Sequence, residues 1–309
     1  MTSLSIARYQ FDFTVESEIH LPQYPTSSLR GVYGHALRKL TCMTKAKTCN
    51  GCPLKAQCAY INLFEPVAKT EQTVKLEKPP VPFMVHETIQ KKQHFKAGET
   101  LSFGMTLLGQ YAIHHLPIIT MAWQQALANG IGYTQGTATL QQVQAINAGQ
   151  STPIYQPKGT LLPHKQETTL TDKVPSNNIT LEFVTPLRLQ SNSKRLQLSQ
   201  LQAQNLLTAT IRRVSMLEHT HSIGFSTSAE QAKTLKAISE KISLIHNLKW
   251  KEWKRYSNRQ QREMQLGGYI GKIQLTGELA PFLPYLQIGQ HTHIGKETVF
   301  GLGQYQLVS

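Results

Sequence analysis

One order of strands and helices occurs twice along this chain of 309 residues, and it limits the possible folds more than any other feature. Residues 2–16 alternate apolar and polar side chains as a half-buried strand does, whereas residues 27–41 space their apolar residues as a helix does. The same criteria predict further strands at 74–90, 99–109 and 137–148 and a helix at 112–129.

The second half follows a similar order after residues 147–178, a polar and proline-bearing stretch without periodicity that is typical of a connection between domains. We predict strands at 178–190, 249–257, 266–276 and 298–308 and helices at 197–218, 228–247 and 280–286. Both halves approximate βαββαβ, the order of the ferredoxin-like fold and of the RNA-recognition motif. The prediction is therefore an α+β protein with two tandem ferredoxin-like (RRM-like) domains, 1–170 and 171–309.

Charge indicates the kind of partner. Lysine and arginine total 32 against 18 acidic residues, a formal net charge of +14, which favours a polyanion such as nucleic acid or an acidic membrane surface. The most apolar window, residues 112–132, is interrupted by histidines, a proline and glutamines, so it predicts a buried helix rather than a membrane span. The first residues lack the layout of a secretory signal. We expect a soluble, cytosolic protein.

All the cysteines of the chain lie in one short segment. Cys42, Cys49, Cys52 and Cys58 have the spacing C-x6-C-x2-C-x5-C, which suits one tetrahedral zinc ion in a loop inserted into the first domain. An iron–sulfur cluster uses the same ligands. Two disulfides or unliganded thiols are the alternative, but thiols of a cytosolic protein stay reduced. A closed four-cysteine site leaves no open position for water, so we expect structural zinc and no catalytic metal.

Residues 27–41 place polar and apolar side chains on opposite faces of the predicted helix. His35 lies opposite the apolar face, with Lys39 at i+4 and Gly31 at i−4. It is either a solvated surface histidine or a group that moves a proton near neutral pH while Lys39 or Arg38 stabilises charge on a phosphate. The second arrangement suffices to cleave RNA through its own 2′-hydroxyl. The sequence has no cluster of acidic residues that would hold catalytic magnesium, so this cleavage would be metal-independent.

Two further segments are candidate RNA contacts. The string "GKETVFGLG" brings Lys296 between glycines whose backbone can approach phosphates closely, although a glycine-rich hairpin is the commoner explanation of such a string. Residues 249–262, "KWKEWKRYSNRQQR", interleave cations with aromatic rings, and we assign Arg255 and Arg259 to RNA contact. The alternative for this segment is an amphipathic edge strand with solvated cations.

Together these segments resemble a known family. The strings "SSLRGVYGHALRKL", "AYINLFEP", "LEFVTPLRL", "RYSNRQ", "LGGYIGKI" and "HIGKETVFGLGQY" are similar, in this order, to motifs of the CRISPR-associated repeat-processing endoribonucleases, the sixth Cas family of the RAMP superfamily. The resemblance implies paired ferredoxin-like folds, binding of the precursor CRISPR transcript, one cut per repeat and retention of the guide. It also implies that the glycine-rich loop, Gly295, Gly301 and Gly303 with Lys296, contacts RNA.

The resemblance also suggests site residues. His35 matches the family's proton-transferring histidine on the first helix, with His20 as a reserve, and Lys39 and Tyr33 match its partners by type. We also expect Arg30 and Arg38 to contact RNA. Two other functions stay open: a catalytically silent RNA-binding subunit of a CRISPR effector complex, and a zinc-loop module that binds nucleic acid or protein.

Overall fold

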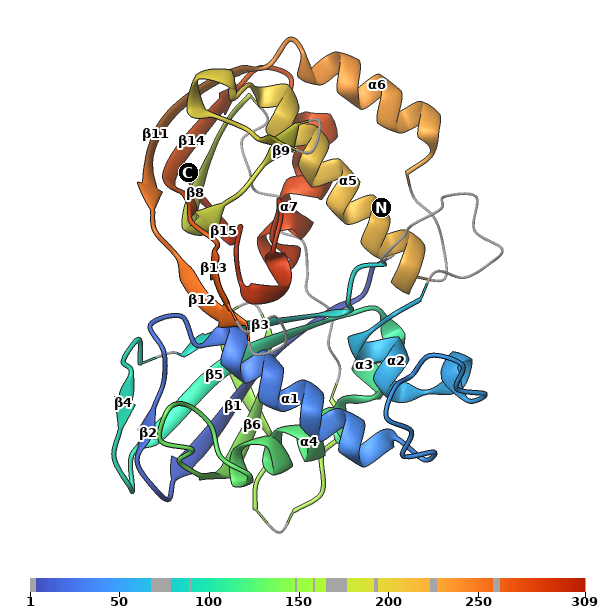
Figure 1. Ribbon diagram of the computed structural model, residues 1–309. Coiled ribbons are helices and arrows are strands. Elements are labelled where there is room, and N and C mark those ends of the chain that lie inside the picture. The colour runs from blue at the N-terminus through green and yellow to red at the C-terminus, as the bar shows by residue number, and fades with distance from the viewer. Residues whose placement is uncertain are drawn as a thin grey trace. The chain divides into compact units, whose positions relative to one another are not determined.

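The computed structural model describes residues 4–67, 79–88, 90–147, 149–157, 159–164, 177–191, 194–222, 227–257 and 262–308, without the side chains of 255–257 and 262–263. The chain divides into two compact units, residues 5–168 and residues 169–309 with the first four residues (Figure 1). No helix in the described part of the chain has both the length and the apolar character needed to cross a membrane.

The N-terminal unit contains a five-stranded antiparallel sheet, a separate pair of short strands, β2 and β4, and helices. Its strands are β1 (Ile6–Val15), β2 (Ile19–His20), β3 (Phe83–Thr88), β4 (His94–Phe95), β5 (Thr100–Leu108), β6 (Ala138–Asn147) and β7 (Gln150–Tyr155). Its helices are α1 (Thr26–Thr41), the 3₁₀ turn η1 (Lys55–Gln57), α2 (Ala59–Phe64), α3 (Gln110–His114) and α4 (Leu116–Ala128). The sheet order β3-β5-β1-β6-β7 is the ferredoxin-like order with β7 added at one edge.

Helices α1 and α4 pack against each other and lie over this sheet (Figure 1). Every second residue of β1 is buried, so its aromatic side chains face the helices' apolar sides. Phe103 of β5 stacks on Phe11, 5.8 Å between centroids, and contacts Trp123 of α4 at 4.5 Å. Tyr33 of α1 stacks on Trp123, with 4.8 Å between the ring centroids. The aromatic core thus fixes which face of α1 is turned inward.

The C-terminal unit repeats the plan. Its strands are β8 (Asn178–Leu187), β9 (Gln190–Ser191), β10 (Lys194–Arg195), β11 (Ser243–Lys251), β12 (Lys254–Ser257), β13 (Arg262–Gln265), β14 (Gly268–Thr276) and β15 (Tyr305–Val308). Its helices are η2 (Leu198–Gln200), α5 (Ala203–His221), α6 (Ala229–Ser239), η3 (Ala280–Phe282), α7 (Leu283–Thr292) and η4 (Thr298–Phe300). The sheet order β11-β14-β8-β15 is again ferredoxin-like, and α5 packs on α7. The two tandem ferredoxin-like folds are confirmed.

Several predicted elements of this unit were wrong in extent, among them the strand at 249–257, which is divided between β11 and β12. Residues 243–247 were assigned to a helix, but Ser243 begins β11, because residues 243–251 pair in register with β14. The helix predicted at 280–286 extends to Thr292. The strand predicted at 298–308 is limited to β15, since the preceding residues form a turn of 3₁₀ helix and a glycine-rich loop. In the N-terminal unit the strand predicted at 74–90 is β3, and residues 74–78 lie outside the described residues.

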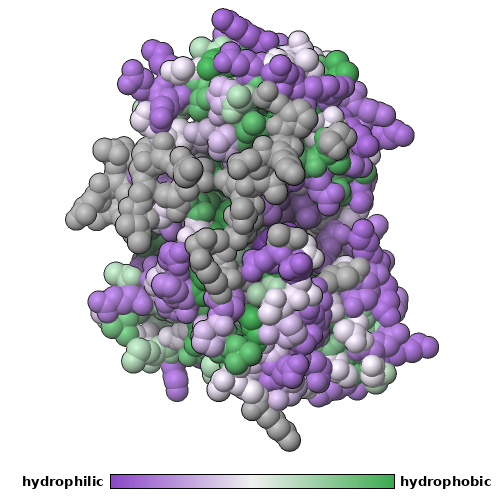
Figure 2. Space-filling view, turned by 180° about the vertical axis from the view of Figure 1, so that it is seen from behind, coloured by the Kyte–Doolittle hydropathy of each residue, from purple (hydrophilic) through white to green (hydrophobic). Residues whose placement is uncertain are grey.

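One face of the molecule is shown in Figure 2, where hydrophilic residues are widespread and apolar ones form scattered patches. This distribution agrees with buried apolar cores in each unit, and the chain's formal charge of +14 is carried mainly by such surface residues.

Candidate nucleic-acid site

Helix α1 exposes a single stripe. Of its residues only Gly31, His35 and Lys39 are exposed to solvent, and their spacing of four places them above one another on one side of the helix. The side chains of His35 and Lys39 therefore lie one turn apart, roughly 5–6 Å between Cβ atoms. No heavy atom lies within 4 Å of the position that a Cβ of Gly31 would take. The stripe gives an imidazole, an ammonium group and a bare stretch of backbone on one open surface.

The other glycine of this helix has a structural explanation. A Cβ at Gly34 would collide with the ring of Phe64 in α2, so the glycine permits α1 and α2 to pack closely. Tyr33, assigned to catalysis by type, is fully buried and stacked on Trp123. Burial raises the pKa of its phenol far above the ordinary value, with Arg30 opposing the shift. Its position in the core, turned away from the stripe, gives Tyr33 a packing role.

Two cations assigned to RNA contact are engaged within the protein. The guanidinium of Arg30 lies 4.1 Å from the centroid of Phe64 and 5.9 Å from that of Phe83, a cation–π arrangement. Arg38 donates hydrogen bonds from Nη2 to the carbonyl oxygens of Ala46, 2.7 Å, and Lys47, 2.8 Å. These contacts make Arg30 part of the helix packing and Arg38 the anchor of the cysteine loop.

The reserve histidine, His20, belongs to a different part of the unit. It pairs with His94 across β2 and β4, and their rings stack 3.8 Å apart. Tyr133, which is 72% exposed, meets the ring of His20 edge-on at 5.1 Å. His20 is thus held by ring contacts, whereas His35 lies beside a cation.

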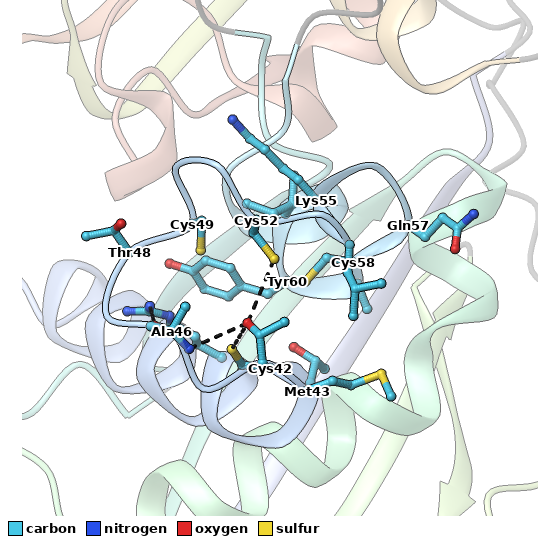
Figure 3. Close-up of a pocket in the computed structure, with 16 residues that line it drawn as sticks. Cys42, Met43, Ala46, Thr48, Cys49, Cys52, Lys55, Gln57, Cys58 and Tyr60 are labelled. Carbon is cyan, nitrogen blue, oxygen red and sulfur yellow. Dashed lines mark hydrogen bonds between the residues drawn. The ribbon is translucent and has the colours of Figure 1, made fainter.

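The four cysteines line one cavity of about 310 Å³ between the end of α1 and the start of α2 (Figure 3). All four are reduced and half-buried. The Thr44 hydroxyl is 3.8 Å from the sulfur of both Cys42 and Cys52, and its hydrogen bond is the main cause that lowers the pKa of the Cys42 thiol. Burial raises the pKa of the Cys49 thiol. The four thiols share one cavity, but among the described residues no group of three or more His, Cys, Asp or Glu side chains is placed to hold a metal ion.

The glycine-rich loop follows α7 in the C-terminal unit. Gly295, Gly301 and Gly303 have φ values of 92°, 85° and 75°, in the left-handed region that favours glycine. The backbone also leaves no room for side chains: a Cβ would strike the carbonyl of Arg188 at Gly295 and that of Ile294 at Gly303. The loop requires these glycines in order to fold.

The loop's backbone amides are used internally. The amide of Gly303 donates to the carbonyl of Pro186, 3.0 Å, and the amide of Gly301 to that of Thr298, 2.9 Å. Lys296 donates its amide to the Arg188 carbonyl, 2.9 Å, but its side chain is exposed. Of the residues assigned to RNA here, Lys296 is therefore the one that offers a free cationic side chain to a ligand.

Two arginines that sequence reasoning missed hold backbone segments of the C-terminal unit. Arg213 of α5 is half-buried and donates from Nε to the carbonyl of Thr292, the last residue of α7, at 3.2 Å. Burial lowers its pKa to about 10. Arg188 donates from Nη1 to the carbonyl oxygens of Gln265 and Gly267. Arg188 lies in the string "LEFVTPLRL", but the string alone assigns it no partner, and Arg213 lies in no quoted string; each acts on backbone far away along the chain.

The aromatic and basic segment 249–262 divides between core and surface. Trp253 is 1% exposed, whereas Trp250 is 38% exposed and lies under the Arg195 guanidinium at 4.6 Å. Its described residues belong mainly to β11, at an edge of the sheet, and to β12. Arg255 lies in β12, its side chain among those not described, and Arg259 lies outside the described residues.

Comparisons with known proteins follow the two units. Residues 4–167 match the family model AF_1859_N, described as an N-terminal domain, and residues 181–305 match the model described as CRISPR-associated endoribonuclease Cas6. A search of the curated proteins finds no match.

Solved structures match over the whole chain. A Cas6 product complex is 15% identical, with a TM-score of 0.61, 98% of this chain covered and 100% of the other. A Cas6 from Thermus thermophilus is 13% identical, with a TM-score of 0.53 and both chains fully covered. A chain of a partial Cas6-RT-Cas1–Cas2 complex is 13% identical, with a TM-score of 0.56, 99% of this chain and 46% of that chain covered. At these identities the likeness concerns the fold.

Proposed function

We propose, because this chain belongs to the Cas6 family of CRISPR-associated endoribonucleases, that it binds CRISPR repeat RNA and cuts the precursor transcript into guide RNAs. The observation that carries the proposal is the stripe of Gly31, His35 and Lys39 on α1, which presents a proton-transfer group and a cation together on an open surface. A histidine confined to the core, or paired with another ring as His20 is, would not support it.

The proposed chemistry uses the RNA's own nucleophile. His35 accepts the proton of the 2′-hydroxyl while O2′ attacks the adjacent phosphorus, and the bond between phosphorus and the 5′ oxygen breaks. The leaving oxygen takes a proton from water, and the protonated His35 returns its proton to the hydroxide that remains. Lys39 stabilises the negative charge that builds on the phosphate oxygens during the attack. The products are a 2′,3′-cyclic phosphate and a 5′-hydroxyl, and the reaction needs no metal ion because the nucleophile is already in the substrate.

RNA binding is assigned to cations of the C-terminal unit. Lys296 beside the glycine-rich loop and Arg255 and Arg259 in the segment after β11 are proposed to contact phosphates, supported by the formal charge of +14. The solved relatives include a product complex and a partial complex with Cas1 and Cas2. We infer that CRISPR repeat RNA is the main partner and that other CRISPR effector subunits are further partners, in the cytoplasm.

The test is cleavage of the repeat RNA encoded with the chain, without added metal and in the presence of EDTA. We expect one cut per repeat, with a cyclic phosphate at the 3′ end of the upstream product. A matched RNA with a single 2′-deoxy nucleotide before the cut should bind with the same affinity and stay intact. Cleavage of the deoxy RNA would contradict the mechanism. Binding without cutting would show a catalytically silent subunit, and indifference to RNA would reject the family function for this chain.

A further inference from the structure

The cysteine loop joins two helices through their capping residues. Cys42 is the C-cap of α1 and Cys58 is the N-cap of α2, so the outer pair of thiols lies where both helices meet the loop. The inner pair, Cys49 and Cys52, belongs to the turn "CNGC", in which Gly51 has a φ of 73°. The sequence thus supplies one thiol at each end of the loop and two close together in its middle.

All four sulfur-bearing side chains face the same hollow. Figure 3 shows Cys49, Cys52 and Cys58 reaching into the space above the end of α1, where Cys42 lies. The Thr44 hydroxyl lies within 3.8 Å of the Cys42 and Cys52 sulfurs and so links the two sides of the hollow. A disulfide requires two sulfurs about 2.05 Å apart, but every one of these cysteines is free.

The charges around the hollow favour a thiolate centre. Arg38, Lys45, Lys47 and Lys55 belong to the loop or the adjoining turn of α1. Four thiolates around a divalent cation carry a net charge of −2, and Arg38 and Lys55, which line the hollow, offset part of it. The Arg38 guanidinium holds the backbone of the loop through the carbonyl oxygens of Ala46 and Lys47, so the loop is tied to the last turn of α1.

The sulfurs line the hollow without meeting at one point. Among the described residues, no group of three or more His, Cys, Asp or Glu side chains has the geometry of a metal centre. Zinc–sulfur bonds of about 2.3 Å in a tetrahedron put the sulfurs roughly 3.8 Å from each other. The cavity of about 310 Å³ is bounded largely by the loop itself, so the loop has the space to contract around an ion.

We propose that the segment Cys42–Cys58 binds one zinc ion through its four thiolates and closes on it, tying the C-cap of α1 to the N-cap of α2. The ion has no open coordination position and takes no part in the chemistry of the stripe. Its effect is structural: it fixes the packing of α1 on α2 that Gly34 and Phe64 begin. Because thiols become thiolates on binding, zinc uptake releases protons. The proposal is independent of the proposed nuclease function.

The first experiment measures metal in the whole chain purified under reducing conditions. We expect about one zinc per chain by elemental analysis, and near zero for the variant Cys49→Ala with Cys52→Ala. Thr48→Ala is the matched control, since Thr48 also lines the cavity but offers no thiol, and it should keep the zinc. Full zinc content in the double variant, or iron with visible absorption in the wild type, would overturn the proposal, as would two disulfides by mass spectrometry.

A second experiment guards against variants that fail to fold. Wild-type chain stripped of metal is titrated with Co²⁺, and the charge-transfer band of cobalt–thiolate bonds should saturate at about one equivalent and vanish when zinc is added. Absence of the band in a chain whose circular dichroism remains native would overturn the proposal. Zinc is also measured before and after the EDTA treatment used for cleavage, so loss of the ion and failure of catalysis are distinguished.

Discussion

Helix α1 and the loop between α7 and β15 both combine glycines with basic side chains, yet the fold uses the two sets differently. In α1, Gly31, His35 and Lys39 face solvent and have no role in packing. In the loop, Gly301 and Gly303 are buried with left-handed conformations, and their amides donate to the carbonyl oxygens of Thr298 and Pro186. The comparison shows that a glycine or basic residue can contact a ligand only where packing and internal hydrogen bonds do not already engage it.

The largest expected effect is the difference in stability between substituting a glycine of the loop and substituting a glycine of α1. Gly303→Ala places a methyl group against the carbonyl of Ile294 at a φ of 75°, so the free energy of unfolding should fall by about 3 kcal/mol or more. Gly31→Ala, in open space on a helix, should raise it by about 0.5–1 kcal/mol. Urea unfolding of both variants measures the difference, and equal midpoints would break the comparison.

A smaller effect on stability is expected for Arg38 of α1, which holds the cysteine loop and is not part of the stripe. Arg38→Met keeps the aliphatic stem but removes the hydrogen bonds to Ala46 and Lys47, and we expect a loss of about 1–3 kcal/mol in stability. Faster proteolysis within residues 42–58 would accompany it. Lys47→Met is the control, because its exposed side chain should be replaceable at little cost. If Arg38→Met left the stability unchanged, Arg38 would again be a candidate for RNA contact.

Lys39→Ala tests the charged member of the stripe. We expect the single-turnover cleavage rate to fall about tenfold, since a cation near the reacting phosphate is lost, while the unfolding midpoint stays the same. Lys39→Arg should recover most of the rate because it keeps the charge. If Lys39→Ala weakened RNA binding but left the rate at saturating protein unchanged, Lys39 would be a binding residue only.

The smallest effect concerns Lys296. Its exposed ammonium should contribute one phosphate contact, so Lys296→Ala should weaken RNA affinity a few-fold and reduce the slope of log affinity against log salt by about 0.7. Lys233→Ala, an exposed lysine of α6, is the matched control and should leave the slope unchanged. Identical salt slopes for the wild type and Lys296→Ala would contradict an RNA contact by this loop.

The stripe was predictable from the sequence because the period of a helix depends on local residues. The inward side of α1, with Leu29, Tyr33 and Leu37, follows from helical spacing alone, and so does the outward position of His35. The start of strand β11 was harder to predict. Helix-forming residues continue to Glu240, and the alternation of side chains that begins near Ile242 is fixed as a strand only by its pairing with β14.

The roles of the basic and glycine residues were less predictable, since they depend on distant backbone. Nothing near Gly303 in the sequence indicates that the carbonyls of Pro186 and Ile294 surround it. Similarly, Arg38 has the helix position of an exposed cation, and only the course of the cysteine loop brings two carbonyl oxygens to it. Side-chain type suggested function in both places, whereas tertiary contacts decided it.

The account depends most on His35 as the group that moves the proton. The direct measurement is the single-turnover cleavage rate of repeat RNA by His35→Ala at saturating protein, with RNA affinity and the unfolding midpoint measured on the same preparation. His94→Ala, an exposed histidine outside α1, serves as the control. We predict a rate lower by about 10²- to 10⁴-fold for His35→Ala alone, with affinity and stability unchanged. A wild-type rate for a folded, RNA-bound His35→Ala would contradict the account and leave His35 a solvated surface residue.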